Sequence, residues 1–251
     1  MIGWRARIGV IQPGDAVLDH EFFECAPRNV SVHLTRTEYP LDLPPLERAL
    51  RLATSSDIEQ AAKTFKAIKP TVVAYACTAA SICRRIGGDT EISSRINNIA
   101  GVPATTTGTA VVAGLRALGV ARVAVLAPYV EAVTSALVHF LSASGLTVVH
   151  HHTAGLRLGF AEVPPWDVYR QAREAFVSEA EALFISCTNF RSLEVVAALE
   201  GDRGRPALSA NQCTMWHALR LAGIHEPVPN LGRLFAVDLH TAAQPAGTAS
   251  T

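Results

Sequence analysis

The chain has 251 residues, of which 49% are hydrophobic and 18% charged, a composition typical of a globular protein with a sizeable buried core. It carries 22 Lys and Arg against 22 Asp and Glu, so its formal net charge is zero and nothing calls for nucleic acid or an anionic membrane as a partner. The longest apolar runs are too short and too interrupted to span a bilayer.

Short β-branched runs and helical stretches alternate along the chain. The first run begins within the first ten residues, where a secretory signal would have a charged region and a long apolar stretch, so we expect no signal peptide and a cytoplasmic protein. The strand-like runs are Ile8–Ile11, Val30–Leu34, Thr71–Ala76, Val123–Leu126, Thr147–His150 and Leu183–Ser186. The helical stretches are Leu46–Ile68, Thr107–Leu118, Val130–Ser144, Trp166–Glu179 and Asn211–Ala222. This alternation predicts an α/β fold with parallel strands and crossover helices on both faces.

The second half of the chain repeats landmarks of the first in the same order. Arg7–Pro13 resembles Arg122–Pro128, and Val72–Thr78 resembles Ala182–Thr188. Chance similarity of two generic α/β halves is the alternative, but the shared order favours duplication. We therefore predict two pseudo-symmetric, flavodoxin-like or Rossmann-like halves with four-stranded parallel sheets and an active site in the cleft between them. The halves are residues 1–118 and 119–235, and part of the C-terminal segment could pack back on the first. Residues 236–251 are predicted to be a disordered tail.

Two cysteines occupy equivalent places in the repeat. Cys77 and Cys187 each follow a buried-looking strand and precede a threonine. Ligands of parallel sheets sit beyond the carboxyl ends of the strands, so two halves packed about a pseudo-twofold axis would point both thiols into one cleft. A nearby helix N-terminus would favour the thiolate of each. Free backbone N–H groups there, with the hydroxyls of Thr78 and Thr188, would hold a carboxylate.

Two thiols on opposite sides of a small carboxylate could catalyse either of two reactions. One could remove a proton while the other delivers one to the opposite face, which inverts a stereocentre. Alternatively, one thiolate could add to an activated double bond while the other handles the proton. Neither route needs a metal or an organic cofactor, and we expect none. His150-His151-His152 does not suggest a metal site, because three consecutive strand residues cannot all face one ion. A protein that only binds small anions, with both cysteines as packing residues, is the non-catalytic alternative.

These segments also carry a family resemblance. Ala76–Ser81 and Ser186–Asn189 resemble the two active-site segments of the aspartate/glutamate racemase superfamily. Within it, Arg7–Pro13, Leu126–Tyr129 and Ala210–Gln212 are most similar to maleate cis-trans isomerases. Arylmalonate decarboxylases and the racemase-like proteins of ectoine degradation belong to the same branch. The resemblance covers roughly residues 5 to 225.

The resemblance implies unequal roles for the two thiols. Cys77 would be the nucleophile that adds to the alkene of maleate, and Cys187 would be its proton partner. Tyr129 would bind a substrate carboxylate, and Thr78 and Thr188 would complete anion pockets. Arylmalonate decarboxylases carry a small residue at the first cysteine position, so Cys77 argues for isomerisation or racemisation. The resemblance further implies a homo-oligomer, either a dimer or a tetramer.

One turn departs from the family pattern. Maleate isomerases carry an asparagine shortly after the first strand that contacts a substrate carboxylate, whereas this chain reads Gln12-Pro13-Gly14-Asp15-Ala16. We count Pro13, Asp15 and Ala79 among the substrate-binding residues. An aspartate at this turn would repel a dicarboxylate unless it points away or is neutral. A racemase of an acidic or ectoine-derived amino acid, working by two-base proton transfer, is therefore the alternative, and an amine on the substrate would fit.

Overall fold

Two sheets of four strands form the core, and the computed structural model describes residues 3–84 and 86–239 of the chain. The first half comprises β1 (Ala6–Pro13), α1 (Asp19–Glu24), β2 (Val30–Thr37), α2 (Pro45–Thr54), α3 (Asp57–Thr64), the 3-10 helix η1 (Phe65–Ile68), β3 (Val72–Tyr75), α4 (Thr78–Ile82), α5 (Gly88–Ala100), β4 (Ala104–Thr106) and α6 (Thr107–Ala117). The second half comprises β5 (Arg122–Tyr129), α7 (Glu131–Ala143), β6 (Thr147–Leu156), the 3-10 helix η2 (Phe160–Glu162), α8 (Pro165–Ala175), β7 (Ala182–Ile185), α9 (Leu193–Arg203), β8 (Ala207–Ser209), α10 (Ala210–Leu221) and the 3-10 helix η3 (Arg233–Ala236).

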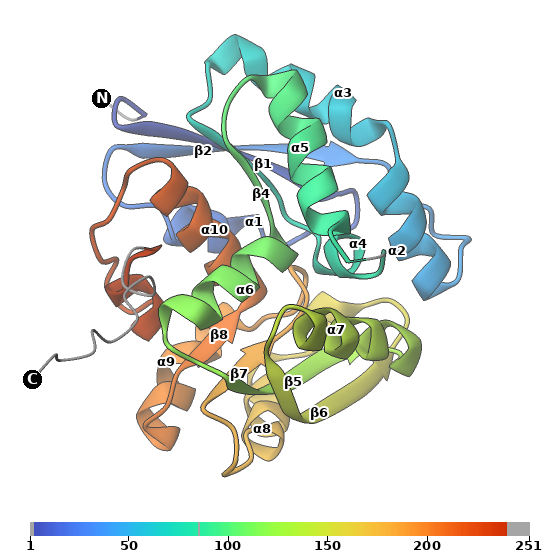
Figure 1. The fold of residues 1–251 in the computed structure, drawn as a ribbon, viewed down its shortest axis with the longest axis vertical. Coiled ribbons are helices and arrows are strands. Elements are labelled where there is room, and N and C mark those ends of the chain that lie inside the picture. The colour runs from blue at the N-terminus through green and yellow to red at the C-terminus, as the bar shows by residue number, and fades with distance from the viewer. Residues whose placement is uncertain (1–2, 85, 240–251) are drawn as a thin grey trace, which may run out of the picture.

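The two sheets have the same topology. The strand order is β2-β1-β3-β4 in the first and β6-β5-β7-β8 in the second, and every neighbouring pair is parallel. In Figure 1 the first sheet lies above the second, with α6 and α10 drawn between them. The predicted α/β fold with two parallel four-stranded sheets is confirmed, and the shared topology supports the inferred duplication.

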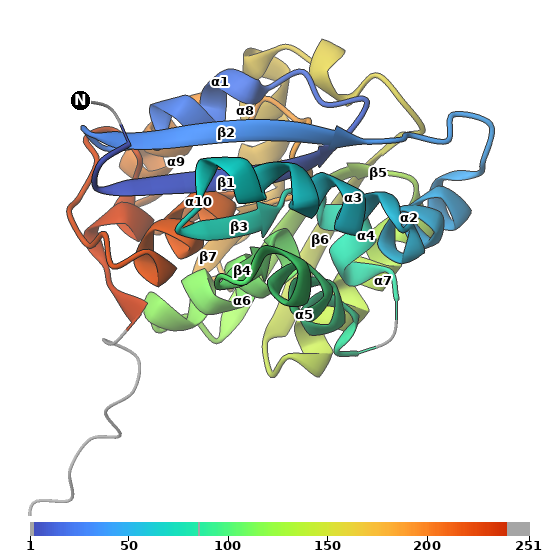
Figure 2. The same cartoon turned by 90° about the horizontal axis from the view of Figure 1, so that it is seen from above.

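The strands that lead to the two cysteines are central in their sheets. β3 lies between β1 and β4, as Figure 2 also shows, and β7 lies between β5 and β8. Every residue of both strands is buried, because helices cover both faces of a parallel sheet of this kind. One residue separates each strand from its cysteine, Ala76 before Cys77 and Ser186 before Cys187. Both cysteines therefore stand at the carboxyl edge of a sheet, where ligands of parallel sheets bind.

Helix α10 belongs to the second half in sequence but packs on the first sheet. It is buried from Ala210 to Arg220 and contacts β3, β4 and α6. The Thr105 hydroxyl hydrogen-bonds Nδ1 of His217 at 2.7 Å, and the hydroxyls of Thr107 and Thr214 lie 2.9 Å apart. The C-terminal segment thus packs back on the first half, as the sequence left open, and the two halves share one core.

One predicted helix is divided in the structure, and two short strands were not predicted. The stretch predicted as one helix over Leu46–Ile68 is divided into α2, α3 and η1, because Ser55 adopts an extended conformation with ψ 139° at the end of α2. The short strands β4 and β8 lie outside the six predicted runs. Three residues are too few to show the alternation by which a strand is recognised in a sequence.

The first residues of the predicted tail are packed against the rest of the chain. The carbonyl of Val237 accepts hydrogen bonds from Nε1 of Trp216 at 3.1 Å and from Nη2 of Arg220 at 2.9 Å. Packing therefore continues at least as far as Val237, inside the segment 236–251 that was expected to be disordered. Residues 240–251 lie outside the described part of the chain.

Candidate active site

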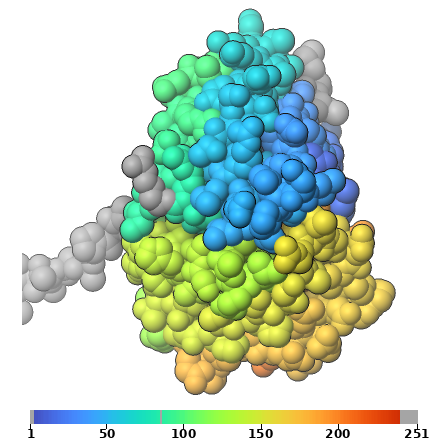
Figure 3. Space-filling model, turned by 90° about the vertical axis from the view of Figure 1, so that its right-hand side faces the viewer, coloured from blue at the N-terminus to red at the C-terminus, as the bar shows by residue number. Residues whose placement is uncertain are grey.

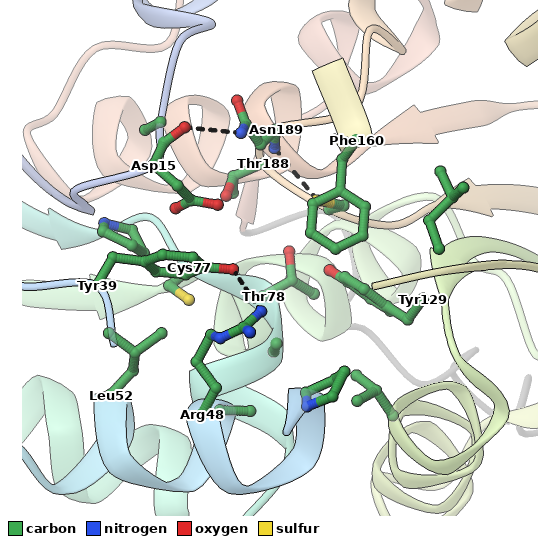
Figure 4. A pocket seen from close by; sticks show the side chains of 18 of the residues that line it. Asp15, Tyr39, Arg48, Leu52, Cys77, Thr78, Tyr129, Phe160, Thr188 and Asn189 are labelled. Atoms are coloured by element: carbon green, nitrogen blue, oxygen red, sulfur yellow. Dashed lines mark hydrogen bonds between the residues drawn. The ribbon is translucent and has the colours of Figure 1, made fainter. Parts of the chain in front are cut away.

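One cavity lies between the two halves and contains both cysteines. Figure 4 shows it from close by, with Asp15, Tyr39 and Cys77 on one side and Tyr129 and Phe160 on the other. The residues predicted from the sequence all line it: Pro13, Asp15, Cys77, Thr78, Ala79, Tyr129, Cys187 and Thr188. The structure therefore brings together residues from the two halves of the repeat at one place.

Cys77 stands between β3 and α4 in an ordinary extended backbone conformation. Its φ is −147° and its ψ is 102°, and its side chain is 6% exposed. The backbone N–H of Ala80 faces the sulfur and lowers its pKa, but the loss of hydration on burial raises the pKa by more. The thiol is therefore protonated in the empty cavity at neutral pH.

Cys187 occupies a strained conformation that Cys77 does not share. Its φ is +87°, a left-handed value that few residues other than glycine adopt, and its side chain is 5% exposed. Its sulfur accepts a hydrogen bond from the backbone N–H of Asn189 at 3.3 Å. Burial nevertheless raises its pKa to about 12, while the N–H of Asn189 and the hydroxyl of Tyr129 lower it. Strain of this kind is typical of functional positions, where it fixes the direction of a reactive group.

The two thiols influence each other as well as their surroundings. A negative charge on Cys187 raises the pKa of Cys77, because like charges in a poorly hydrated cavity repel. The pair can therefore hold one negative charge much more readily than two. The sequence led us to expect thiolates favoured by helix N-termini, but burial outweighs the nearby N–H groups at both positions. At neutral pH both thiols are therefore protonated, and after one of them ionises the pair still keeps the other proton.

The two threonine hydroxyls predicted to bind an anion differ in whether they already have a hydrogen-bond partner in the protein. The Thr78 hydroxyl is buried, with its residue 1% exposed, and has no hydrogen-bond partner among the described residues. The Thr188 hydroxyl donates to the Ala76 carbonyl at 3.3 Å. A buried hydroxyl without a partner carries a free-energy cost, which a bound acceptor such as a carboxylate would remove. Thr78 is therefore the stronger candidate for an anion contact.

Tyr129 and Phe160 form one wall of the cavity. Their rings meet edge to face, with centroids 5.6 Å apart and an interplanar angle of 83°. The Tyr129 hydroxyl accepts a long hydrogen bond from Ser186 at 3.4 Å. Leu52 and Val133 extend the apolar lining. The cavity thus combines a few polar groups with a largely apolar wall, a composition typical of small-molecule sites.

Asn189 joins the two halves at the cavity, although the sequence analysis did not select it as a site residue. Its Nδ2 donates to the Asp15 carbonyl at 2.9 Å, and its Oδ1 accepts from the Val17 N–H at 3.0 Å. These bonds fix the turn after β1 against the segment that follows Cys187. The backbone at Asp15 is therefore held from the opposite half of the chain.

Arg48 is a second residue that the sequence analysis did not select. It projects from α2, is 6% exposed and lies with its guanidinium 5.0 Å from the centre of the Tyr39 ring. Its five N–H groups donate, over 2.7 to 3.3 Å, to the Tyr39 hydroxyl and to the carbonyls of Pro40, Leu41, Leu43 and Arg157. The bond to Arg157 crosses to the second half. Figure 3 shows the blue surface of the first half in contact with the yellow surface of the second.

A buried pair behind the cavity supports the second cysteine segment. Nδ2 of Asn211 donates to the Glu21 carboxyl at 2.6 Å and to the Thr188 carbonyl at 2.9 Å. Burial raises the pKa of Glu21 to about 8. Ala210–Gln212 belongs to the segments that resemble the family, and in the structure Asn211 holds the chain directly after Cys187.

Two kinds of feature are absent from residues 3–84 and 86–239. Within these ranges no three His, Cys, Asp or Glu side chains are grouped as metal ligands would be. Nor does any helix there have the length and apolar character needed to cross a membrane.

Known proteins resemble this chain over most of its length. The sequence model of the arylmalonate decarboxylase family matches residues 52–235. A maleate isomerase of Nocardia farcinica is 32% identical over 181 residues, which cover 67% of this chain and 70% of that protein. An arylmalonate decarboxylase of Bordetella bronchiseptica is 30% identical over 169 residues, which cover 65% of this chain and 70% of that protein. A solved structure of a cysteine-to-serine mutant of the Nocardia farcinica maleate cis-trans isomerase, with a covalently bound succinylcysteine intermediate, superposes with a TM-score of 0.82. It is 26% identical and covers 92% of this chain and 98% of that one.

Proposed function

The chain belongs to the arylmalonate decarboxylase family, and we propose that it is a cofactor-independent cis-trans isomerase of a small unsaturated carboxylate of the maleate type. The observation that carries the proposal is the pair of thiols, Cys77 and Cys187, that line one cavity. The succinylcysteine adduct in a maleate isomerase relative supports chemistry through a thioether. Cys77 is the residue to which the sequence resemblance assigns the nucleophile.

In the proposed reaction one proton moves back and forth within the site. The Cys77 thiolate forms a C–S bond to one alkene carbon, and the Cys187 thiol gives its proton to the other carbon. The former double bond is now single and rotates. The Cys187 thiolate then takes a proton back from the same carbon, the C–S bond breaks with its electron pair returning to Cys77, and the trans alkene leaves. Thr78 and Tyr129 are proposed to hold a carboxylate during the rotation.

The proposal is tested by incubating the pure enzyme with cis-butenedioic acid and its derivatives and following the trans product by proton NMR. We expect conversion without any added cofactor. If no compound is converted and no adduct forms on Cys77, cis-trans isomerisation is excluded. Exchange of the α-proton of acidic amino acids in deuterated water, without cis-trans conversion, would instead support the two-base racemase alternative.

We also predict that activity rises with pH. The reactive form carries one thiolate, and burial raises the pKa of both thiols above the usual range for cysteine, so only a small fraction of the enzyme is in that form at neutral pH. The logarithm of kcat/KM should therefore rise with a slope near one from about pH 6 to about pH 9. Initial rates in overlapping buffers measure this, and a plateau below pH 8 would mean that the thiolate already exists in the resting enzyme.

A further inference from the structure

The side of the cavity formed by Asp15 and Tyr39 is poorly suited to a second carboxylate. Figure 4 shows the Asp15 side chain directed into the cavity rather than away from it. Its negative charge raises the pKa of both Cys77 and Cys187, so it lies close enough to act on the reacting groups. A substrate carboxylate on this side would meet like charge in a poorly hydrated space.

Within the part of the chain that the structure describes, the charges of Arg48 and Arg36 lower the pKa of Asp15, but both guanidinium groups are already bonded to protein partners and are not free to bind a second carboxylate. Arg48 lines the cavity, but all five of its N–H groups already donate to protein oxygens. Arg36 is bound to the carboxylate of Asp19 at 2.6 Å and to Gln12 at 2.8 Å. Arg157 also lines the cavity, but its side chain is exposed to solvent, where attraction to an anion is screened.

A hydrogen-bond donor suits the same position. Burial raises the pKa of the Asp15 carboxyl, and a hydrogen bond from the Tyr39 hydroxyl offsets part of that rise, so the carboxyl offers acceptor oxygens on this side of the cavity. The bonds between Asn189 and the backbone at Asp15 and Val17 fix the turn that carries this carboxyl. A carboxylate held in this way favours an N–H group over an anion.

We propose that Asp15, positioned by Tyr39 and Asn189, recognises a nitrogen that donates hydrogen bonds, so that the substrate is an unsaturated monocarboxylate with a carboxamide or an amine at its other end. This inference rests on the proposed isomerase function and narrows its substrate class. The addition and elimination at Cys77 are unchanged, and no further reactant is involved.

The inference is tested by comparing three cis substrates: maleate, its monoamide maleamate, and cis-4-aminobut-2-enoate. We expect the wild type to convert one of the two nitrogen compounds with a kcat/KM at least about tenfold higher than that for maleate, and the better of the two identifies amide or amine. Asp15→Asn, which keeps the shape but removes the charge, should shift the preference towards maleate by about tenfold or more. Tyr39→Phe should weaken the preference in the same direction.

Two further variants serve as controls. Glu24→Gln removes an exposed carboxylate at the end of α1, outside the cavity, and the substrate preference should stay as in the wild type. Arg157→Gln should also leave the order of the substrates unchanged. A wild type that prefers maleate, a preference unaltered in Asp15→Asn, or maleate turnover that depends on Arg157 would overturn the inference.

Binding measurements separate this inference from the proposed reaction. Succinate, succinamate and 4-aminobutanoate resemble the three substrates but have no double bond, so they bind without reacting. Calorimetry should give one of the nitrogen compounds at least about tenfold tighter binding than succinate, and Asp15→Asn should reduce that ratio. This result would support the recognition site even if no isomerisation were found. Equal or tighter binding of succinate, or no binding of any of the three, would contradict it.

Discussion

Cys77→Ala and Cys187→Ala are expected to abolish turnover, each lowering kcat by about a thousandfold or more, but to stop the reaction at different points. Without the Cys77 sulfur no C–S bond forms, so the protein keeps its own mass after incubation with substrate. With Cys187→Ala the thioether can still form, its proton coming from water, but no thiolate is in place to remove that proton again. Intact-protein mass spectrometry should therefore find a substrate adduct in Cys187→Ala alone, and peptide mapping should place it on Cys77.

Cys83→Ala provides the matched control. Cys83 lies only six residues beyond Cys77 at the end of α4, but it does not line the cavity. Its removal should change kcat by less than about twofold, as expected for a substitution away from reacting groups. Full activity in either Cys77→Ala or Cys187→Ala would exclude the two-thiol mechanism. An adduct on Cys187 in the Cys77→Ala variant would mean that Cys187 is the nucleophile and Cys77 the proton partner.

The two cysteines differ in backbone conformation, a difference that their own sequence segments do not show. Both sit in a Cys-Thr pair after a buried strand, so the sequence makes them look equivalent. In the structure Cys77 has an extended backbone, whereas Cys187 has a φ of +87°. A sequence pattern can reveal that two segments are related, but a strained dihedral angle arises from the surrounding packing. The asymmetry between the halves therefore had to come from the structure.

The site residues that could be predicted from the sequence are those marked by the residues next to them in the chain. Each predicted residue lies at the end of a strand or shortly after it, where a β-branched or apolar run marks the strand, as with Tyr129 at the end of β5 and Cys77 after β3. Arg48 and Asn189 were not found because their roles depend on distant partners. Arg48 donates to a carbonyl at Arg157, and Asn189 binds the backbone at Asp15, in each case across the two halves. No local spacing signals such contacts, and on α2 the arginine reads as an ordinary polar position of an amphipathic helix.

Glu21→Gln is expected to make the protein more stable than the wild type at pH 8, and by less at pH 5. Glu21 is fully buried on α1, and burial raises its pKa from 4.5 to about 8. Below pH 4.5 the carboxyl is protonated in both the folded and the unfolded chain, so it does not change the free energy of unfolding. Between pH 4.5 and about 8 the unfolded chain releases the proton while the folded chain keeps it, and stability falls as the pH rises. Glutamine does not titrate, so the variant does not lose stability in this way as the pH rises.

The expected size follows from the same shift. Each pKa unit corresponds to about 1.4 kcal/mol, so the free energy of unfolding of Glu21→Gln relative to the wild type should rise by roughly 3 to 4 kcal/mol between pH 5 and pH 8. Urea unfolding at both pH values measures it. Glu24→Gln is the matched control, because Glu24 lies on the same helix with its side chain exposed, and its effect should stay within about 0.5 kcal/mol at both pH values. If Glu21→Gln behaves like this control, Glu21 is ionised in the folded protein, and the hydrogen bond from Asn211 holds a charged carboxylate behind Cys187.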